Sequence, residues 1–313
     1  MRIALYRFFL VIISFVCFFP LSASAEPVLT IDADRQFEFA EHYFRAGEYY
    51  KAIGEYERFI HFCPEDVRVE AAMYNIGLSY FNGEKFQEAI DAFNALLAKF
   101  PSTDFRTKAQ FKISECLVRL NGQLQAIGYL NDITATAEYK DISDEAYYRR
   151  GWIYLEMDRW EEAEESFDLI SQKNRDKYRL KTLSREMSKK KDLKTKSPTI
   201  AGMLAIIPGA GHLYCGRYKD ATVTLILNSA MIYAAYEAFD EGHDVLGGII
   251  TFFELGFYSG NIYSAVNCAH KYNKGIKNRF LDYLRENSRI KVGLNSNQKD
   301  KAPGLLISYR LTF

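Results

Sequence analysis

Between residues 32 and 178 the apolar positions follow a helical spacing that repeats along the chain. Apolar side chains recur at i, i+3, i+4 and i+7 in two segments per repeat, which predicts pairs of amphipathic helices. A small residue marks the register, because Ala52, Ala89, Ala126 and Ala163 follow one another at intervals of 37 residues. Such a period is typical of helical solenoids, whose stacked units bury each other's apolar faces. The pattern therefore predicts an all-α solenoid of four helix pairs.

Small residues are expected at two kinds of position in each pair. Gly77 and Gly151 fall opposite Ala89 and Ala163, where only small side chains would let the two helices of a pair touch. Other residues fall in the breaks between the helices and are expected to end the first helix of each pair. They are Gly47, Gly83, Gly122 and Asp158.

This small/large/small order, with Pro64 and Pro101 closing the first two units, resembles the tetratricopeptide repeat (TPR) family. The resemblance covers residues 26 to 178, and the third and fourth units lack the closing proline. The interval and phrases such as LLAKFPSTDFRTKAQFKISECLVRL look closest to periplasmic TPR proteins of bacterial envelope assembly. The resemblance implies a protein-binding scaffold whose first helices line a concave face.

The concave positions, counted from the alanine register, form an aromatic groove with interspersed carboxylates. Rigid aromatic side chains in a concavity favour binding of a protein or peptide. The alternative is that these rings pack against a neighbouring helix or a folded-back tail. The candidate groove residues are Phe37, Glu41, Phe44, Tyr74, Phe81, Phe111, Glu115, Tyr148 and Trp152.

Residues 1 to 25 read as a secretory signal. Arg2 and Arg7 precede an apolar run from residue 8 to 19, and Ala23 and Ala25 fit a cleavage site after residue 25. An uncleaved anchor is the alternative. Both interpretations export the repeats, so we expect a bacterial inner-membrane protein with its TPR domain in the periplasm.

Charge divides the chain although its net charge is zero. Residues 26 to 177 hold 29 acidic and 18 basic residues, whereas the chain from residue 179 onward holds 11 acidic and 20 basic. The acidic repeats disfavour nucleic acid as a partner. Residues 179 to 198 are predicted to form a basic capping helix, with its apolar stripe at Tyr178, Leu180, Leu183 and Met187, and a linker. Its charge fits contact with anionic lipid headgroups or an ordinary solvated linker.

Residues 199 to 269 are predicted to form a small transmembrane helical hairpin. Of three apolar stretches, 199 to 214, 221 to 239 and 245 to 269, the last two are long enough to cross a bilayer. Two spans, three spans and a soluble apolar hairpin all remain open. The first stretch resembles the P-G-x-G-x-x-Y-x-G signature of TM-two-domain-type membrane hairpins, through Pro208, Gly209, Gly211, Tyr214, Gly216 and Arg217.

Two sets of residues in this region are candidates for contacts within the membrane. Gly256, Gly260 and Ser264, with Cys268, share one helix face that favours close packing on the preceding helix or on another copy of the chain. The second set could form a polar network or a site at membrane depth. Its members are Asn228, Glu254, Asn261 and Asn267.

Residues 270 to 313 are predicted to be a basic tail that ends in an amphipathic strand, GLLISYRLTF. That strand could pair with a sheet edge of a partner or be a plain apolar tail. The sequence contains no phosphate loop, metal-ligand spacing or hydrolytic motif, so no catalytic residue, metal or cofactor is expected.

The function expected from these features is a non-enzymatic envelope scaffold, which binds a protein or peptide while tethered to the inner membrane. Two alternatives remain. One is a membrane-active protein, such as a transport or insertion accessory, that is regulated by its TPR domain. The other is a soluble periplasmic or outer-membrane assembly adaptor.

Overall fold

The computed structural model describes residues 32–288, and this part of the chain is helical throughout with no strand. Its helices divide into two compact units, Met1–Ala109 and Gln110–Phe313, and the boundary falls within α6. The predicted signal peptide and the predicted terminal strand lie outside the described residues.

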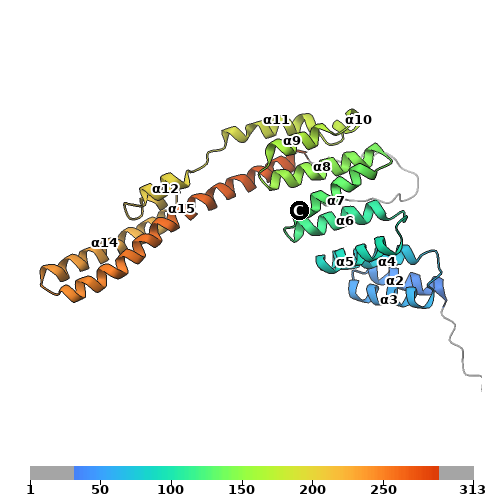
Figure 1. Cartoon of the computed structure of the whole chain (residues 1–313), viewed down its shortest axis with the longest axis horizontal. Helices are drawn as coiled ribbons and strands as arrows, with labels where there is room; N and C mark the ends of the chain where they lie inside the picture. The colour runs from blue at the N-terminus through green and yellow to red at the C-terminus, as the bar shows by residue number, and fades with distance from the viewer. Residues whose placement is uncertain (1–31, 289–313) are drawn as a thin grey trace, which may run out of the picture. The chain divides into compact units, whose positions relative to one another are not determined.

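The first unit contains two antiparallel helix pairs (Figure 1). Asp32 caps the first helix by accepting from the backbone N–H groups of Asp34 and Arg35. The cluster under the first pair contains Ala40, Ala52 and Phe59, all fully buried. The helices are α2 (Ala33–Arg45), α3 (Tyr49–Phe62), α4 (Val69–Asn82) and α5 (Phe86–Lys99).

The second unit continues with two more pairs, followed by short capping helices. Ala126, Leu130 and Ile133 lie in one core cluster of the third pair. The pairs are α6 (Arg106–Arg119) with α7 (Gln123–Thr136), and α8 (Lys140–Glu156) with α9 (Trp160–Asp168). The caps are α10 (Gln172–Arg175), α11 (Leu180–Met187) and the 3-10 helix η1 (Ser188–Asp192).

The predicted register alanines hold the pairs together as expected, since Ala52, Ala89, Ala126 and Ala163 are all fully buried. The glycines opposite them have a different role from the predicted one. A Cβ on Gly77 would overlap the ring of Phe93, and a Cβ on Gly151 would overlap the ring of Phe167. The missing side chain therefore makes room for an aromatic ring.

The turns within the pairs also repeat every 37 residues, and two of the four left-handed positions, Gly47 and Asp158, are residues that the sequence singled out. The left-handed backbone conformation falls on Gly47, Glu84, Asn121 and Asp158, with φ of 77°, 58°, 60° and 66°. Gly83 and Gly122 adjoin these positions without occupying them. Gly83 is the C-cap of α4 and therefore ends that helix as predicted, whereas Gly122 is the N-cap of α7.

The remaining helices form an elongated part of the second unit, in which α14 lies side by side with α15 (Figure 1). Helix α15 runs without a break past residue 269, where the sequence predicted the start of the tail, and it ends beside the fourth helix pair. The helices are α12 (Pro198–Leu204), α13 (Ala210–Tyr214), α14 (Tyr218–Asp240) and α15 (Asp244–Ser288).

Candidate functional site

The first predicted groove residues lie on α2 and are half-buried. The ring of Phe37 contacts the rings of Tyr56 and Phe59, with centroids 5.7 and 5.1 Å away. Phe44 contacts Tyr49 edge-on at 5.9 Å, and Glu41 forms an i,i+4 ion pair of 3.5 Å with Arg45. Phe37 is therefore partly a core residue, and its side chain is only half-buried.

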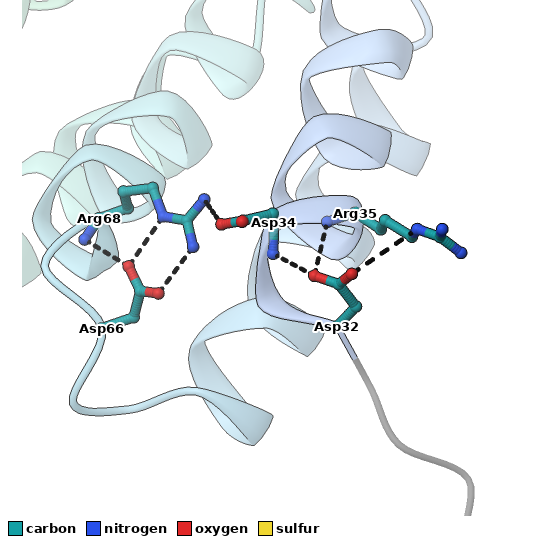
Figure 2. Close-up of polar contacts among 5 residues, drawn as sticks. All are labelled: Asp32, Asp34, Arg35, Asp66 and Arg68. Carbon is teal, nitrogen blue, oxygen red and sulfur yellow. Dashed lines mark hydrogen bonds and ion pairs between the residues drawn. The ribbon is translucent and has the colours of Figure 1, made fainter.

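Arg68 is held by two carboxylates, those of Asp34 and Asp66 (Figure 2). Its guanidinium contacts Asp34 at 2.8 Å and Asp66 at 2.7 Å. It also covers the rings of Phe37 and Phe59, 5.2 and 5.4 Å from their centroids. The hydrogen bonds from Arg68 lower the pKa of Asp66 to about 2. The sequence analysis did not single out this arginine, which ties the start of α2 to the segment before α4.

The α4 groove residues are also part of aromatic clusters. Tyr74 stacks on Phe105 with centroids 4.8 Å apart and lies 5.5 Å from Phe93, and Phe81 meets Phe86 at 5.9 Å. All of these rings are half-buried or buried. The half-buried rings among them, Tyr74, Phe81, Phe86 and Phe105, give the first unit a partly exposed aromatic surface.

In the second unit, Phe111 and Glu115 lie on α6. The Phe111 ring is covered by the guanidinium of Arg149, 4.6 Å from its centroid. Glu115 pairs with Lys112 at 3.1 Å. Both groove residues are half-buried, so their partly accessible surface carries a cation beside each of them.

The groove positions on α8 are not open, which corrects the expectation for Trp152. Its side chain is only 5% exposed because the end of α15 packs over the fourth helix pair. The α15 residues in this cluster are Phe280, Leu281 and Leu284. The ring of Tyr148 stacks on the ring of Tyr178, with centroids 4.4 Å apart, and burial raises the pKa of Tyr148. At the fourth pair, the predicted groove residues therefore pack against a folded-back segment of the same chain, which was the alternative to partner binding.

Polar contacts fix the end of α15 in this position. Arg285 forms an ion pair with Glu156, and the ammonium of Lys277 donates to the Glu156 carbonyl at 3.2 Å. Burial raises the pKa of the Glu156 carboxyl, against the opposing effect of Arg285. The sequence offered a signal that was missed, since apolar residues at 280, 281 and 284 in the supposed tail have helical spacing.

A second polar contact ties α11 to α15. The carboxylate of Glu186 accepts from the ammonium of Lys189 at 2.5 Å and from the Tyr283 hydroxyl at 2.5 Å. These bonds lower the pKa of Glu186 to about 2. The predicted capping stripe lies in the same place, with all four members buried: Tyr178, Leu180, Leu183 and Met187.

Two segments of the chain, residues 71–103 and 145–176, match a family model of the tetratricopeptide repeat. The chain contains tetratricopeptide repeats. They correspond to the second and fourth helix pairs, where Gly77 and Gly151 accommodate a phenylalanine ring. TPR domains generally bind proteins, which fits the aromatic surfaces of the two units.

Solved TPR structures resemble the chain at low identity. A tetratricopeptide repeat protein from Parabacteroides merdae is 18% identical, covering 80% of this chain and 98% of its own, with a TM-score of 0.43. A TPR repeats protein from Bacteroides fragilis is 15% identical, covering 82% and 99%, with a TM-score of 0.32. No curated protein matches the chain significantly.

The region after the TPR helices has its apolar side chains on the outside. By length and composition, α15 is the one helix within residues 32–288 that could cross a membrane, and only 17% of its most apolar window is buried. A core helix of a soluble protein would be mostly buried. Helix α14, which we expected to be able to cross a membrane as well, is not apolar enough by the same measure of length and composition. Large exposed side chains on the two helices include Val223, Ile226, Tyr233, Phe252 and Leu255, each at least 57% exposed.

The P-G-x-G-x-x-Y-x-G residues pack the short helices of this region together. Gly209, with φ of 85°, leaves no space for a Cβ beside the Ala221 backbone, and Gly211 leaves none between α12 and α15. The Tyr214 hydroxyl accepts from the Ser197 backbone N–H at 3.1 Å. Pro208 is half-buried, Gly216 has φ of 77°, and Arg217 forms an ion pair with Asp220 at 2.5 Å. These contacts give the motif residues a packing role, and the membrane family that they resemble stays a prediction.

The predicted small-residue face of α15 does not contact α14. Nothing lies within 4 Å of a Cβ built on Gly256 or Gly260, and both residues are exposed. Ser264 lies on the same face, but its hydroxyl reaches His212 on α13 at 3.0 Å. We expected this face to pack on α14 or on another copy of the chain, and for Gly256 and Gly260 the expectation of α14 is wrong.

Proposed function

We propose that this protein is a membrane-tethered scaffold whose TPR helices bind a protein or peptide. The observation that carries the tether is the reversed polarity of α14 and α15. Ile226 and Phe252 are 64% and 74% exposed, whereas Asn228 and Glu254 are 2% and 7% exposed. Lipid is the environment that favours this arrangement, because apolar side chains face hydrocarbon at no cost and polar ones are shielded.

The open aromatic surface of the first unit supports the partner-binding half of the proposal. The rings of Phe37, Phe44, Tyr74 and Phe81 are half-buried on helices, and rigid rings contribute contact area at a small entropic cost. The fourth helix pair is occupied by α15 in the same chain. We therefore assign partner binding to the first unit, together with Glu41, and to Phe111 and Glu115 in the second.

The predicted signal sequence supports export of the TPR helices, with the hairpin in the inner membrane. The open face at Gly256 and Gly260 supports contact with a second copy in lipid, where small residues let helix backbones approach.

In-cell photocrosslinking tests the assignment of the binding surface. A photoreactive amino acid replaces Phe81 on the proposed surface, or Tyr50, which is 64% exposed on α3 and outside the predicted groove. We expect one discrete protein adduct from position 81 and none from position 50. Equal adducts from both positions, or none from position 81, would contradict partner binding at this surface.

Flotation with lipid vesicles tests the tether separately. Full-length protein should float with the vesicles and remain bound after an alkaline carbonate wash. Release by carbonate would favour the soluble adaptor over the tethered scaffold.

A membrane-active protein regulated by its TPR helices is the second candidate. It is favoured by the continuity of α15, which belongs to the hairpin at Glu254 and to the TPR core at Leu284. A partner that displaced the end of α15 would act directly on a membrane helix. If Leu284→Ala releases the α15 end and changes membrane permeability while position 81 still forms its adduct, this second candidate gains over the simple scaffold.

A further inference from the structure

The contact between α14 and α15 is a regular seam that contains polar residues. Its positions alternate in steps of three and four, as in an antiparallel coiled coil, and every one is buried or half-buried. On α14 they are Ala221, Thr224, Asn228, Met231, Ala235 and Ala238. On α15 they are Gly247, Thr251, Glu254 and Tyr258. The next positions of the same face pack on α12 and α13, and they are Asn261, Ala265 and Cys268.

Asn228 and Glu254 fall in neighbouring layers of this seam. The register follows from the antiparallel order and from the turn end, where Gly247 lies against the ring of Phe239. Counted outward from that end, Glu254 falls in the layer of Met231, and Asn228 falls in the next layer with Tyr258. The pairing of the helices therefore places the two polar residues about one helical turn apart along the seam.

Three oxygen atoms of this pair have no hydrogen-bond partner. They are both carboxyl oxygens of Glu254 and Oδ1 of Asn228. The amide nitrogen of Asn228 is already used, because it donates to the Thr224 carbonyl at 2.8 Å. Thr251 cannot supply a donor either, since its hydroxyl donates to the Gly247 carbonyl at 2.8 Å. The site therefore contains acceptors and lacks a proton.

No basic side chain compensates the carboxyl of Glu254. The sequence contains no lysine or arginine between Lys219 and Lys271. His212 on α13 bonds to Ser264, ten residues further along α15. The other titratable groups of α14 lie at its ends or on its exposed side: Tyr218, Lys219, Asp220, Tyr233, Tyr236, Glu237 and Asp240.

We propose that Glu254 and Asn228 form a proton-binding site inside the hairpin, in which the protonated carboxyl donates to Oδ1 of Asn228. The bound proton removes a charge that apolar surroundings would strongly disfavour. It also supplies the one O–H donor that this group of acceptors lacks. The inference rests on the proposed placement of α14 and α15 in lipid.

Infrared spectroscopy of the full-length protein in lipid vesicles tests this site directly. At neutral pH we expect the carbonyl band of a protonated carboxylic acid. The band should be lost in Glu254→Gln and kept in Glu237→Gln, which changes an exposed carboxyl of α14. In Asn228→Leu, a substitution of similar size, the band should move to higher frequency because the acid O–H has lost its acceptor. Absence of the band in the wild type, or no effect of either seam substitution, would overturn the proposal.

Two further measurements identify the occupant and separate this proposal from the tether. Replacing choline chloride by sodium chloride should leave the band unchanged. Loss of the band in sodium would assign the site to a metal cation and overturn the proton. Flotation is measured on the same samples. Protein that floats but lacks the band contradicts the proton site alone, whereas protein that does not float contradicts the proposed membrane tether.

Discussion

The TPR helix pairs and the α14–α15 hairpin use the same helical geometry with opposite polarity. In the first pair, Ala52 and Phe59 are fully buried, whereas charged residues such as Lys51 and Arg58 are exposed. In the hairpin, Asn228 and Glu254 are buried while Ile226 is 64% exposed. Helical spacing therefore places one face inward in both regions. The composition of that face indicates which solvent lies outside.

Glycine shows the same contrast on a smaller scale. Gly77 lies beneath the Phe93 ring, so its missing side chain is replaced by a neighbour within the same helix pair. Gly256 has nothing within 4 Å and leaves its helix backbone open. A small residue in the pairs completes a core, whereas one in the hairpin leaves a face accessible to another helix.

The largest effect is expected from removing the ring that fills a helix pair. Phe93→Ala should lower the free energy of unfolding by about 3–5 kcal/mol, because Phe93 is fully buried and its loss leaves a cavity above Gly77. Urea unfolding of the full-length protein, followed by circular dichroism, measures the change. The matched control is Phe62→Ala, at a ring that is 52% exposed on α3. Similar losses for both variants would show that this ring does not hold the pair together.

A charge on the outside of the hairpin should weaken membrane binding by about 3 kcal/mol. Ile226→Lys places an ammonium on the exposed side of α14, where a soluble protein would tolerate it and lipid would not. Flotation with vesicles measures the retained fraction. Leu124→Lys, at a residue 66% exposed on α7, should leave flotation unchanged. If Ile226→Lys floats like the wild type, the hairpin does not face lipid at this position.

Two alanine substitutions should have opposite signs within the TPR pairs. Gly77→Ala should destabilise the protein by about 1–3 kcal/mol, because the new methyl group overlaps the Phe93 ring. Gly54→Ala should stabilise it by up to about 1 kcal/mol, because nothing lies within 4 Å and alanine favours helix. Differential scanning calorimetry gives the order of the melting temperatures. The reverse order would mean that Phe93 moves away at little cost.

The sequence alone predicted the features of the fold that follow from the spacing of apolar residues. The all-α fold, the four helix pairs, the buried register alanines and the capping stripe around Leu183 were all predicted from spacing, which depends on local geometry. Glu84 and Asn121 were missed as left-handed turn residues because an adjacent glycine is the stronger signal.

The occupation of the fourth pair by α15 could not be located from the sequence. Trp152 has the spacing of a groove residue, and what covers it begins at Phe280, more than 100 positions later. Periodicity says which face of a helix is apolar and leaves open which distant segment packs on it. Burial of polar atoms at Asn228 and Glu254 depends in the same way on the pairing of two helices.

The smallest effect concerns the end of α15 that packs on the fourth helix pair. The Glu186 carboxylate, bonded by Lys189 and Tyr283, has a pKa of about 2, below its ordinary 4.5. A depressed pKa stabilises the fold at pH values above 4.5, and this contribution is lost as the pH falls from about 4.5 to about 2. The wild type should therefore lose more stability than Glu186→Gln over that interval.

Tryptophan fluorescence reports this contact, since Trp152 and Trp160 lie in the cluster with the end of α15. Thermal unfolding is followed at pH 6, 4 and 3, and Glu164→Gln, at an exposed carboxylate of α9, serves as the control. We expect the wild type and the control to converge on Glu186→Gln as the pH falls. A constant difference between wild type and Glu186→Gln across that range would mean that the contact is held by Leu284 and its apolar neighbours alone. The end of α15 would then be held by burial of apolar side chains, as the TPR helix pairs are.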